Sequence, residues 1–331
     1  DGSESVSQQF TATVTAVNDA PTITSTAGTS ATEDAAYSYT ITASDVDGDA
    51  LTYSAPTTPG WLSFATDTHI LSGTPTNDNV GDHSVVLRVT DGTENVDQSF
   101  TVTVSNTNDT PVLVSITDPS SVLEDGDNIV VTVSPTDIDA GASLTVTVTT
   151  NNGSLFPAGT VTVSPESGGT GVERTITMNP PDNQNGTALV TVSVTDGSES
   201  VSQQFTATVT AVNDVPIITS TAGTSATEDA LYSYTITASD VDGDALTYSG
   251  ETVPSWLSFN TSTHILSGTP TNDNVGDHSV VLRVSDGTVD VEQSFTVTVS
   301  NTDDAPLVGN IPDQSVESGE SFDTFDLDDY L

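Results

Sequence analysis

The sequence predicts an all-β protein in which Greek-key β-sandwich domains follow one another in a linear array. First, the chain contains an internal repeat: Asp1–Asp19 reads DGSESVSQQFTATVTAVND, and the identical sequence recurs at Asp196–Asp214. Such a repeat is expected of a tandem array. Second, apolar and polar residues alternate with period two through stretches rich in Val, Thr, Ile, Tyr and Phe, which strands prefer. Third, no segment shows the 3.6-residue period of an amphipathic helix. Repeating units of about 100 residues with many short strands favour a sandwich.

Strands are expected in the same order along each unit. Alternation is clearest at residues 37–42, 85–89, 100–104, 144–148, 190–194 and 205–209. Asp-Gly dipeptides, which favour tight hairpin turns, separate the last two strands of each unit at Asp91-Gly92, Asp196-Gly197 and Asp286-Gly287. Trp61 and Trp256 each precede Leu-Ser-Phe, and we expect these large aromatic side chains to pack in the cores.

Two kinds of unit alternate along the chain. Residues 20–109 and 215–304 are near-copies that share HILSGTPTNDNVGDHSVVLRV, whereas residues 110–214 form a divergent second kind. Residues 1–19 match the end of that second kind, so we expect them to be the closing strands of a preceding unit. Residues 305–331 are expected to open a further unit.

The charge balance excludes several functions. The chain has 47 acidic and 3 basic residues, for a net charge of -44. Nucleic-acid binding needs Lys and Arg against phosphates, so nucleic acid is not an expected partner. Anionic membrane surfaces are disfavoured, and without an apolar run of 18 residues no membrane insertion is expected. With no cysteine to form disulfides, a compact chain of this charge implies bound cations or high salt.

The acids recur at fixed intervals. Asp1 and the Asp of each hairpin Asp-Gly lie 18 residues before a linker Asp, at positions 1 and 19, 91 and 109, 196 and 214, and 286 and 304. From the linker Asp to a Glu-Asp pair the interval is 14 or 15 residues, and from that Glu to an Asp-x-Asp it is 12 or 13. Most other residues differ between the two kinds of unit, so overall similarity does not account for the spacing.

This pattern of oxygen donors predicts calcium sites. Calcium takes six to eight oxygen ligands from carboxylates, amides and carbonyls, and it relieves the repulsion between clustered carboxylates. The alternative is that Asp and Asn simply occupy turns and solvated edges. A helix–loop–helix calcium loop is excluded, because no Glu closes the Asp45-Val-Asp47-Gly-Asp49 segment at position 12 and no helix flanks it.

The acids resemble the calcium motifs of cadherin repeats. The near-copies, with WLSF, LSGTPTN and VGDHSVVLRV, are similar to dystroglycan-type cadherin-like or Ig-like bacterial modules. Residues 110–214 resemble tandem repeats of very large bacterial surface proteins. The resemblance implies repeats of a secreted or surface-anchored adhesin of RTX type, a class often exported by type I secretion. No export signal is visible in this sequence. The first acid of the family's linker motif is replaced by Ala16 and Ala211.

The expected calcium ligands group at the domain junctions. By the resemblance, Asp78, Asp182 and Asp273 occupy the place of a ligand in the family's Asp-Arg-Glu motif, which is absent here. The full set is Glu33, Asp78, Asn106, Asn108, Asp109, Asp137, Asp139 and Asp196 at the junction of 20–109 with 110–214; Glu124, Asp182, Asn213, Asp214, Asp240, Asp242 and Asp286 at the next; Asn18, Asp19, Asp45, Asp47 and Asp91 at the front; and Glu228, Asp273, Asn301, Asp303, Asp304, Asp326 and Asp328 at the back.

Three functions from different classes are compatible with this sequence. The first is a calcium-rigidified spacer that projects binding domains of an extracellular adhesin from the cell surface. The second is a module that itself binds polysaccharide or other copies of the protein in cell–cell or biofilm adhesion. The third is an accessory region of a large secreted enzyme. Near-identical copies favour the spacer, and we expect no catalysis, because His69, His83, His264 and His278 are two positions copied twice without a nucleophile motif.

Overall fold

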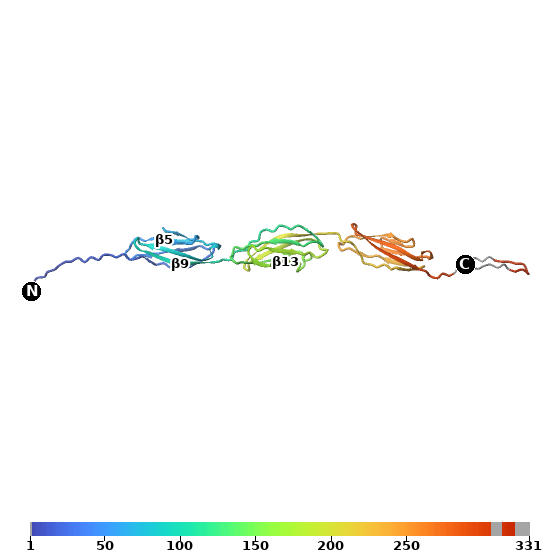
Figure 1. Ribbon diagram of the computed structural model, residues 1–331, viewed down its shortest axis with the longest axis horizontal. Coiled ribbons are helices and arrows are strands. Elements are labelled where there is room, and N and C mark those ends of the chain that lie inside the picture. Colours follow the sequence, from blue (N-terminus) through green and yellow to red (C-terminus); the bar gives the residue numbers. More distant parts are fainter. Residues whose placement is uncertain (1, 306–312, 322–331) are drawn as a thin grey trace. The chain divides into compact units, whose positions relative to one another are not determined.

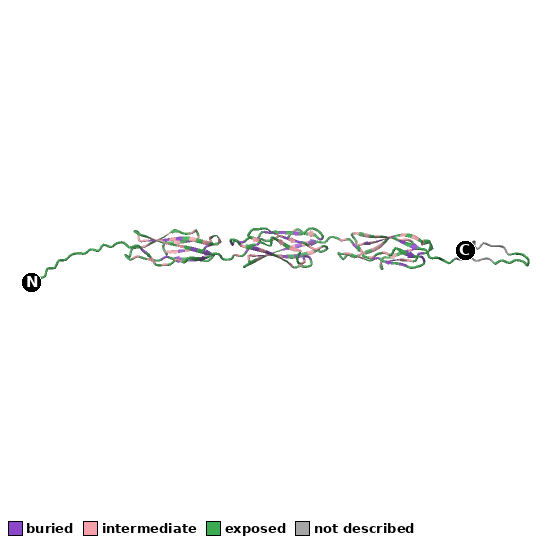
Figure 2. Cartoon of the chain, turned by 60° about the horizontal axis from the view of Figure 1, so that its bottom comes forward, coloured by how far each residue is buried: buried purple, intermediate pink, exposed green. Residues whose placement is uncertain are grey.

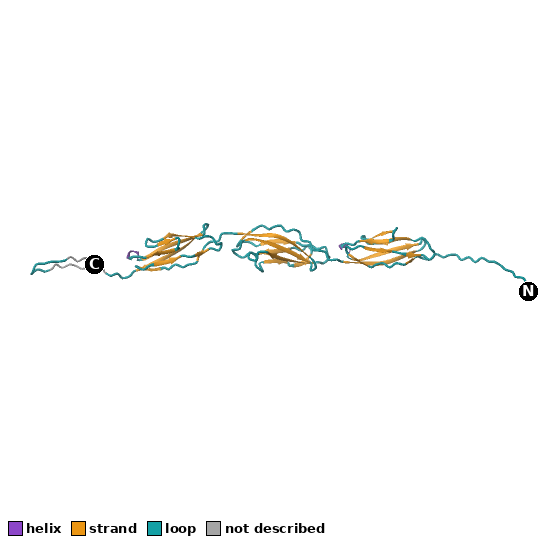
Figure 3. Cartoon of the chain, turned by 180° about the vertical axis from the view of Figure 1, so that it is seen from behind, coloured by secondary structure: helices purple, strands orange, loops and turns teal. Residues whose placement is uncertain are grey.

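The computed structural model describes residues 2–305 and 313–321, and the all-β prediction is confirmed there. Strands form tandem β-sandwiches, and the only helices among the described residues are two short 3-10 turns, η1 (Asn77–Asn79) and η2 (Asn272–Asn274) (Figure 3). The chain forms two compact units, Asp1–Val209 and Thr210–Leu331. The first unit contains two sandwiches and the second contains one.

The first sandwich, which carries β5 and β9 in Figure 1, has a four-stranded sheet in the order β2-β9-β8-β5 and a three-stranded sheet in the order β3-β7-β6. A short β1–β4 pair lies beside them, and β2 joins β9 in parallel. The long β8–β9 hairpin is closed by the Asp91-Gly92 turn. Its strands are β1 (Thr22–Ile23), β2 (Ser30–Thr32), β3 (Tyr37–Thr40), β4 (Ala43–Ser44), β5 (Thr52–Thr57), β6 (Ser63–Ala65), β7 (Ile70–Gly73), β8 (Gly81–Thr90) and β9 (Asn95–Ser105).

The middle sandwich, which carries β13 in Figure 1, has a five-stranded sheet in the order β10-β17-β16-β12-β14 and a three-stranded sheet in the order β11-β15-β13. Its first segment forms an isolated bridge between Val112 and Thr136, beyond the end of β11. Its strands are β10 (Val122–Leu123), β11 (Ile129–Val133), β12 (Ser143–Thr150), β13 (Val161–Ser164), β14 (Ser167–Gly169), β15 (Arg174–Met178), β16 (Gly186–Thr195) and β17 (Ser200–Thr210).

The third sandwich, in the second unit, repeats the first strand by strand. Its sheets run β19-β26-β25-β22 and β20-β24-β23, with a β18–β21 pair. Its strands are β18 (Ile217–Ile218), β19 (Ser225–Thr227), β20 (Tyr232–Thr235), β21 (Ala238–Ser239), β22 (Thr247–Thr252), β23 (Ser258–Asn260), β24 (Ile265–Gly268), β25 (Gly276–Ser285) and β26 (Asp290–Ser300).

Period-two alternation places one face of each strand in a core. On β8, Val85, Leu87 and Val89 are buried between exposed or half-buried neighbours, and the buried residues follow the strands in Figure 2. Fully burying such a side chain stabilises the fold by about 1.5–3 kcal/mol. Trp61 packs edge-on against Tyr37 at a ring distance of 6.0 Å. Gly73 is required beside it, because an added Cβ would lie 1.9 Å from the carbonyl oxygen of Trp61.

Residues 2–17 differ from expectation. We expected closing strands of a preceding unit at 1–19, but residues 2–17 form no strand and are exposed. Residues 5–15 have the same sequence as 200–210, which form β17 and pair along their length with β16. A strand therefore depends on its neighbour as well as on its own sequence.

Candidate metal centre

The Asp-x-Asp turn has the same geometry in each sandwich. The first carboxylate accepts the backbone N–H of the second Asp through Oδ1, at 2.9 Å for Asp45, 2.8 Å for Asp137 and 3.0 Å for Asp240. The other oxygen, Oδ2, is buried in all three and has no hydrogen-bond partner. Burying an ionised oxygen without a donor or a counter-charge is costly. A cation at this position would satisfy that oxygen.

The linker is tied to the same turn. The backbone N–H of the linker Asp donates to Oδ2 of the second Asp in the turn, at 2.8 Å from Asp19 to Asp47 and 2.8 Å from Asp109 to Asp139. In the second unit the bond from Asp214 to Asp242 is 2.7 Å. The linker carboxylate and the Asp-x-Asp carboxylates are thus drawn to one end of each sandwich.

The hairpin Asp completes this end. Asn18 donates to Oδ2 of Asp91, Asn108 to Asp196 and Asn213 to Asp286, each at 2.9 Å. Oδ1 of each Asp accepts two N–H groups of its own turn. The Asn18 amide and then the turn N–H groups lower the pKa of Asp91. The Glu199 and Ser198 N–H groups, with Asn108, lower the pKa of Asp196, and Asn213 with its turn lowers that of Asp286. The 18-residue step is the length of chain that returns from this hairpin to the next linker.

A buried Glu lies at the opposite end of each sandwich. Glu33, Glu124 and Glu228 are only 2–3% exposed. The Glu33 and Glu228 carboxylates each accept a linker N–H at 3.2 Å, and Glu124 accepts the Asn185 amide at 2.9 Å. The following Asp has a positive φ of 56–58° in all three cases. Asp tolerates this left-handed conformation better than most residues, so in the Glu-Asp pair the Asp forms the turn and the Glu points inward.

Within the first unit these ends combine into one cluster. Ligand oxygens of Glu33, Asp109 and Asp139 all lie within 4.8 Å of one another. They come from the end of the first sandwich, the linker and the start of the middle sandwich. Two unit charges about 4 Å apart repel by about 1 kcal/mol even in water. The Asp109 N–H and the Asn106 amide, which donates at 2.7 Å, lower the pKa of Asp139 and keep it ionised.

Two further triads are local to one loop. Asp45, Asp47 and Asp49 form one, and Asp240, Asp242 and Asp244 form its copy. Asp49 and Asp244 were not among the expected ligands, although the sequence shows them in Asp-Val-Asp-Gly-Asp. The middle sandwich has no third acid here, because Ala140, Gly141 and Ala142 follow Asp139.

At the expected ligand Asp78, the neighbouring side chain is the one in contact with the cluster. Asp78 is exposed, and the side chain that reaches the cluster is Asn77, whose Nδ2 lies 3.3 Å from Asp109 Oδ2 and 3.3 Å from Asp139 Oδ1. The copy behaves alike: Asn272 donates to Asp304 at 3.2 Å, and Asp273 is exposed. A one-residue difference in a turn changes which side chain points inward, and the spacing of acids alone gives no signal for an Asn.

The remaining expected ligands are placed as follows. Asp182 is exposed, and the side chain that contacts Glu124 is that of Asn185. At the end of the third sandwich, the Asn301 amide donates to the Thr302 carbonyl at 3.0 Å and Asp303 is exposed. Asp326 and Asp328 lie outside the described residues.

The histidines have structural contacts. His83 Nε2 lies 2.6 Å from the Asn79 carbonyl oxygen, and the ring packs edge-on against Trp61. The His69 ring stacks on Tyr53 at 3.8 Å. The same contacts recur at His278 and His264.

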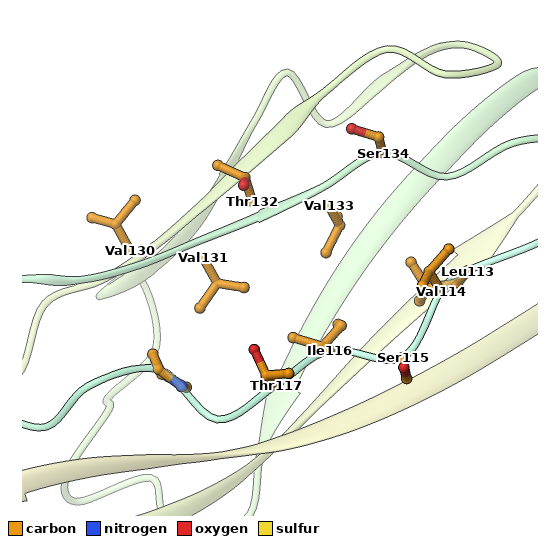
Figure 4. Close-up of a pocket in the computed structure, with 11 residues that line it drawn as sticks. Leu113, Val114, Ser115, Ile116, Thr117, Val130, Val131, Thr132, Val133 and Ser134 are labelled. Atoms are coloured by element: carbon orange, nitrogen blue, oxygen red, sulfur yellow. The ribbon is translucent and has the colours of Figure 1, made fainter.

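An open groove lies along β11 of the middle sandwich. It has a volume of about 470 Å³ and is lined by Leu113–Thr117, Pro119 and Val130–Ser134 (Figure 4). Its walls are apolar with Ser and Thr hydroxyls, and they carry no charge.

The fold and these domain ends define a protein of tandem β-sandwiches with acidic, oxygen-rich junctions. Residues 20–105 and 215–300 match the family model described as Putative Ig domain, and residues 108–211 match the one described as Bacterial Ig domain. The first model matches more than half of the 331 residues, and the chain belongs to the Putative Ig domain family. No curated protein matches the chain significantly.

Solved structures also resemble the chain. Drosophila N-cadherin EC1-4 is similar with 15% identity and a TM-score of 0.37 over 87% of this chain and 76% of that one. Mouse protocadherin-24 EC1-3 has 16% identity and a TM-score of 0.39 over 75% and 90%. The endo-fucoidan hydrolase MfFcnA4 from glycoside hydrolase family 107 has 21% identity and a TM-score of 0.29 over 82% of this chain. This chain spans 42% of that hydrolase's length. Among the described residues, no helix has the length and apolarity needed to cross a membrane.

Proposed function

We propose that this chain is a calcium-rigidified spacer of a long extracellular bacterial adhesin of RTX type, which projects binding domains from the cell surface. Tandem Ig-like domains are consistent with an extracellular extender or adhesion region. We propose domains at 20–109, 110–214 and 215–304, with partial repeats at 1–19 and 305–331. The role is mechanical, and the chain performs no catalysis.

The observation that carries this proposal is the cluster of Glu33, Asp109 and Asp139. Because its three carboxylates come from one sandwich, the linker and the next sandwich, a cation bound to them would link all three. Calcium fits the donor set, which consists of carboxylates, amides and backbone groups without sulfur or imidazole. In the same turn as Asp139, the buried and unpartnered Oδ2 of Asp137 also needs a counter-charge.

Calcium would supply the positive charge that this junction lacks. Glu33 and the linker Asp109 would hold it from the upstream side, and Asp137 and Asp139 from the downstream side. Without it, like charges favour an open and mobile linker. At a free calcium concentration of 100 times the dissociation constant, one site would stabilise the folded state by about 2.7 kcal/mol.

The test combines calorimetry with small-angle scattering. We expect D137A/D139A to lower the calcium stoichiometry of the chain and to remove part of the calcium-dependent increase in its maximum dimension. Glu173→Ala, which removes an exposed acid of the same sandwich, serves as the matched control and should change neither. Unchanged stoichiometry in D137A/D139A, or identical scattering in calcium and in chelator, would contradict the proposal. Sodium at equal ionic strength should not replace calcium, because screening acts on diffuse charge.

A further inference from the structure

Asn77 lies at the edge of the carboxylate cluster in a position that its hydrogen bonds do not explain well. Its amide nitrogen is 3.3 Å from both Asp109 and Asp139, beyond the usual 2.7–3.2 Å range of N–H···O bonds. The Asn106 amide, by contrast, is 2.7 Å from the same oxygen of Asp139. The Asn77 amide therefore lies between two carboxylates and makes a strong hydrogen bond to neither.

The backbone of Asn77 is fixed independently of the cluster. In η1, the Asn79 N–H donates to the Thr76 carbonyl at 2.7 Å, and the Val80 N–H donates to the Asn77 carbonyl at 3.2 Å. The Asn79 side chain accepts the Thr76 N–H at 2.9 Å, and His83 lies 2.6 Å from the Asn79 carbonyl. The backbone of the turn is thus held in place, and the side-chain torsions of Asn77, including rotation of its terminal amide, are the freedom that remains there.

An Asn amide carries two N–H donors on one side and a carbonyl acceptor on the other. A rotation of half a turn about its last side-chain torsion exchanges the side that faces the cluster. Beside carboxylates alone, the donor side is favoured. Beside a divalent cation, the donor side is repelled and the oxygen side becomes a ligand of the type that calcium takes from Asn. The second unit repeats the arrangement, because Asn272 on η2 reaches Asp304 at 3.2 Å.

We propose that Asn77 is a calcium ligand of the first unit's junction, contributed by the upstream sandwich, and that its amide turns from donor to acceptor when the cation binds. This inference rests on the proposed calcium site. It replaces Asp78 by its neighbour and gives the upstream sandwich a second ligand besides Glu33. Through η1, His83 and Trp61, the bound ion is then connected to the core of the first sandwich.

The experiment is a calcium titration of the whole chain with Trp256→Phe as background, so that Trp61 alone reports by fluorescence. We expect N77A to shift the calcium midpoint upward about tenfold or more, as when support for a metal ligand is lost. N77D, which adds a carboxylate, should shift the midpoint downward. D78N, one residue along the same turn, should leave it unchanged.

The two possible roles of Asn77, ligand or displaced donor, predict opposite shifts of the calcium midpoint in N77A. If its amide were only a donor that the cation displaces, N77A would bind calcium as tightly as the parent or more tightly, and this result would overturn the inference. A midpoint moved by D78N and not by N77A would also overturn it. Asp139→Asn separates the proposed calcium site from the assignment of Asn77 as its ligand. If D139N loses the calcium-dependent change in fluorescence while N77A keeps it, the calcium junction stands and the Asn77 assignment fails. If neither variant changes the titration, the proposed function fails as well.

Discussion

The first and middle sandwiches share their acidic ends and differ along one edge. In the first, the Tyr39 hydroxyl lies 2.7 Å from Ser25 Oγ and donates to Gln98 at 2.8 Å, and the Gln98 amide donates to the Ser25 carbonyl at 2.9 Å. This closed set of bonds ties the first segment to β3 and β9. In the middle sandwich, the corresponding position of β11 is Val131, and the first segment is bridged at Val112 to Thr136, beyond the end of β11.

The groove of the middle sandwich follows from that difference. Val131 and Val133 line it, where β3 of the first sandwich carries the Tyr39 ring and its hydroxyl contacts. The acidic turns are nevertheless alike in both sandwiches, because backbone N–H groups of the linker and the hairpin fix them. The comparison shows that the junction geometry is set at the ends of the sandwich and does not depend on how its edge is packed.

The largest effect is expected at Tyr39. Y39A should destabilise the first sandwich by about 3–5 kcal/mol, because it removes a buried ring and leaves the Gln98 carbonyl without its donor. Val131→Ala should cost the middle sandwich only about 1–2 kcal/mol, at roughly 0.8 kcal/mol for each lost carbon group. Calorimetric unfolding of the whole chain measures both.

Two controls sharpen this contrast. Y39F keeps the ring and should cost about 0.5–1.5 kcal/mol, the worth of a typical hydrogen bond. Y234A should reproduce Y39A, since Tyr234 makes the same contacts with Ser220 and Gln293 in the third sandwich. Equal losses in Y39A and Val131→Ala would mean that the edges are energetically equivalent.

The next largest effect is expected from the negative charge of Glu33, whose effect on stability should change sign when calcium binds. Glu33 is 3% exposed beside two other carboxylates. E33Q should therefore leave the chain as stable in chelator, or more stable by about 1 kcal/mol, because it removes a like charge. In saturating calcium the same variant should lose about 1–3 kcal/mol, since a buried charged contact is lost.

The measurement for E33Q is thermal unfolding with and without calcium. Glu94→Gln removes an exposed acid from the same sandwich and should show no such crossover. Destabilisation of E33Q by the same amount in both conditions would assign Glu33 a purely structural role.

The sequence predicted the strands and the acidic frame well because both have a regular signal. The period-two run at 85–89 lies inside β8, and the Asp-Gly turn closes the β8–β9 hairpin. That Asn77 and not Asp78 reaches the carboxylate cluster was not predictable, because it depends on the phase of a three-residue turn. The groove was missed because its cause is a packing difference between Tyr39 and Val131. Residues 2–17 show that an alternating sequence alone does not make a strand. The sequence SVSQQFTATVT forms a strand at 200–210, where it pairs with β16, and forms none at 5–15.

A third expectation concerns acid pH. The Asp109 N–H and the Asn106 amide lower the pKa of Asp139 in the folded state. Its contribution to stability is therefore fully present above the unfolded value of about 3.9 and is lost as the pH falls through the lower folded value. Carbon-13 NMR of the Asp139 carboxyl in chelator should show titration below the ordinary range, with Asp91 and Asp196 behaving alike. An Asp139 that titrates at or above 3.9 would contradict the donor geometry at this junction.

The smallest effect separates the two kinds of turn. Asp49 lies with Asp45 and Asp47 in one loop, and its N–H reaches Asp45 Oδ1 at a long 3.4 Å, whereas the middle sandwich has no acid after Asp139. Because Asp49 is exposed and weakly bonded, D49A should change stability in chelator by less than about 0.5 kcal/mol.

In calcium, D49A should raise the calcium concentration needed for the stability increase of the first sandwich only a few-fold, about 1 kcal/mol or less. D137A/D139A in the middle sandwich should instead abolish the effect at its junction, since their loop has no third acid to replace them. Asp67→Ala, an exposed loop acid of the first sandwich, provides the baseline for loss of charge alone. If D49A proved as severe as D137A/D139A, the third acid would be an essential ligand, and the two kinds of sandwich would bind calcium by different donor sets despite their shared frame.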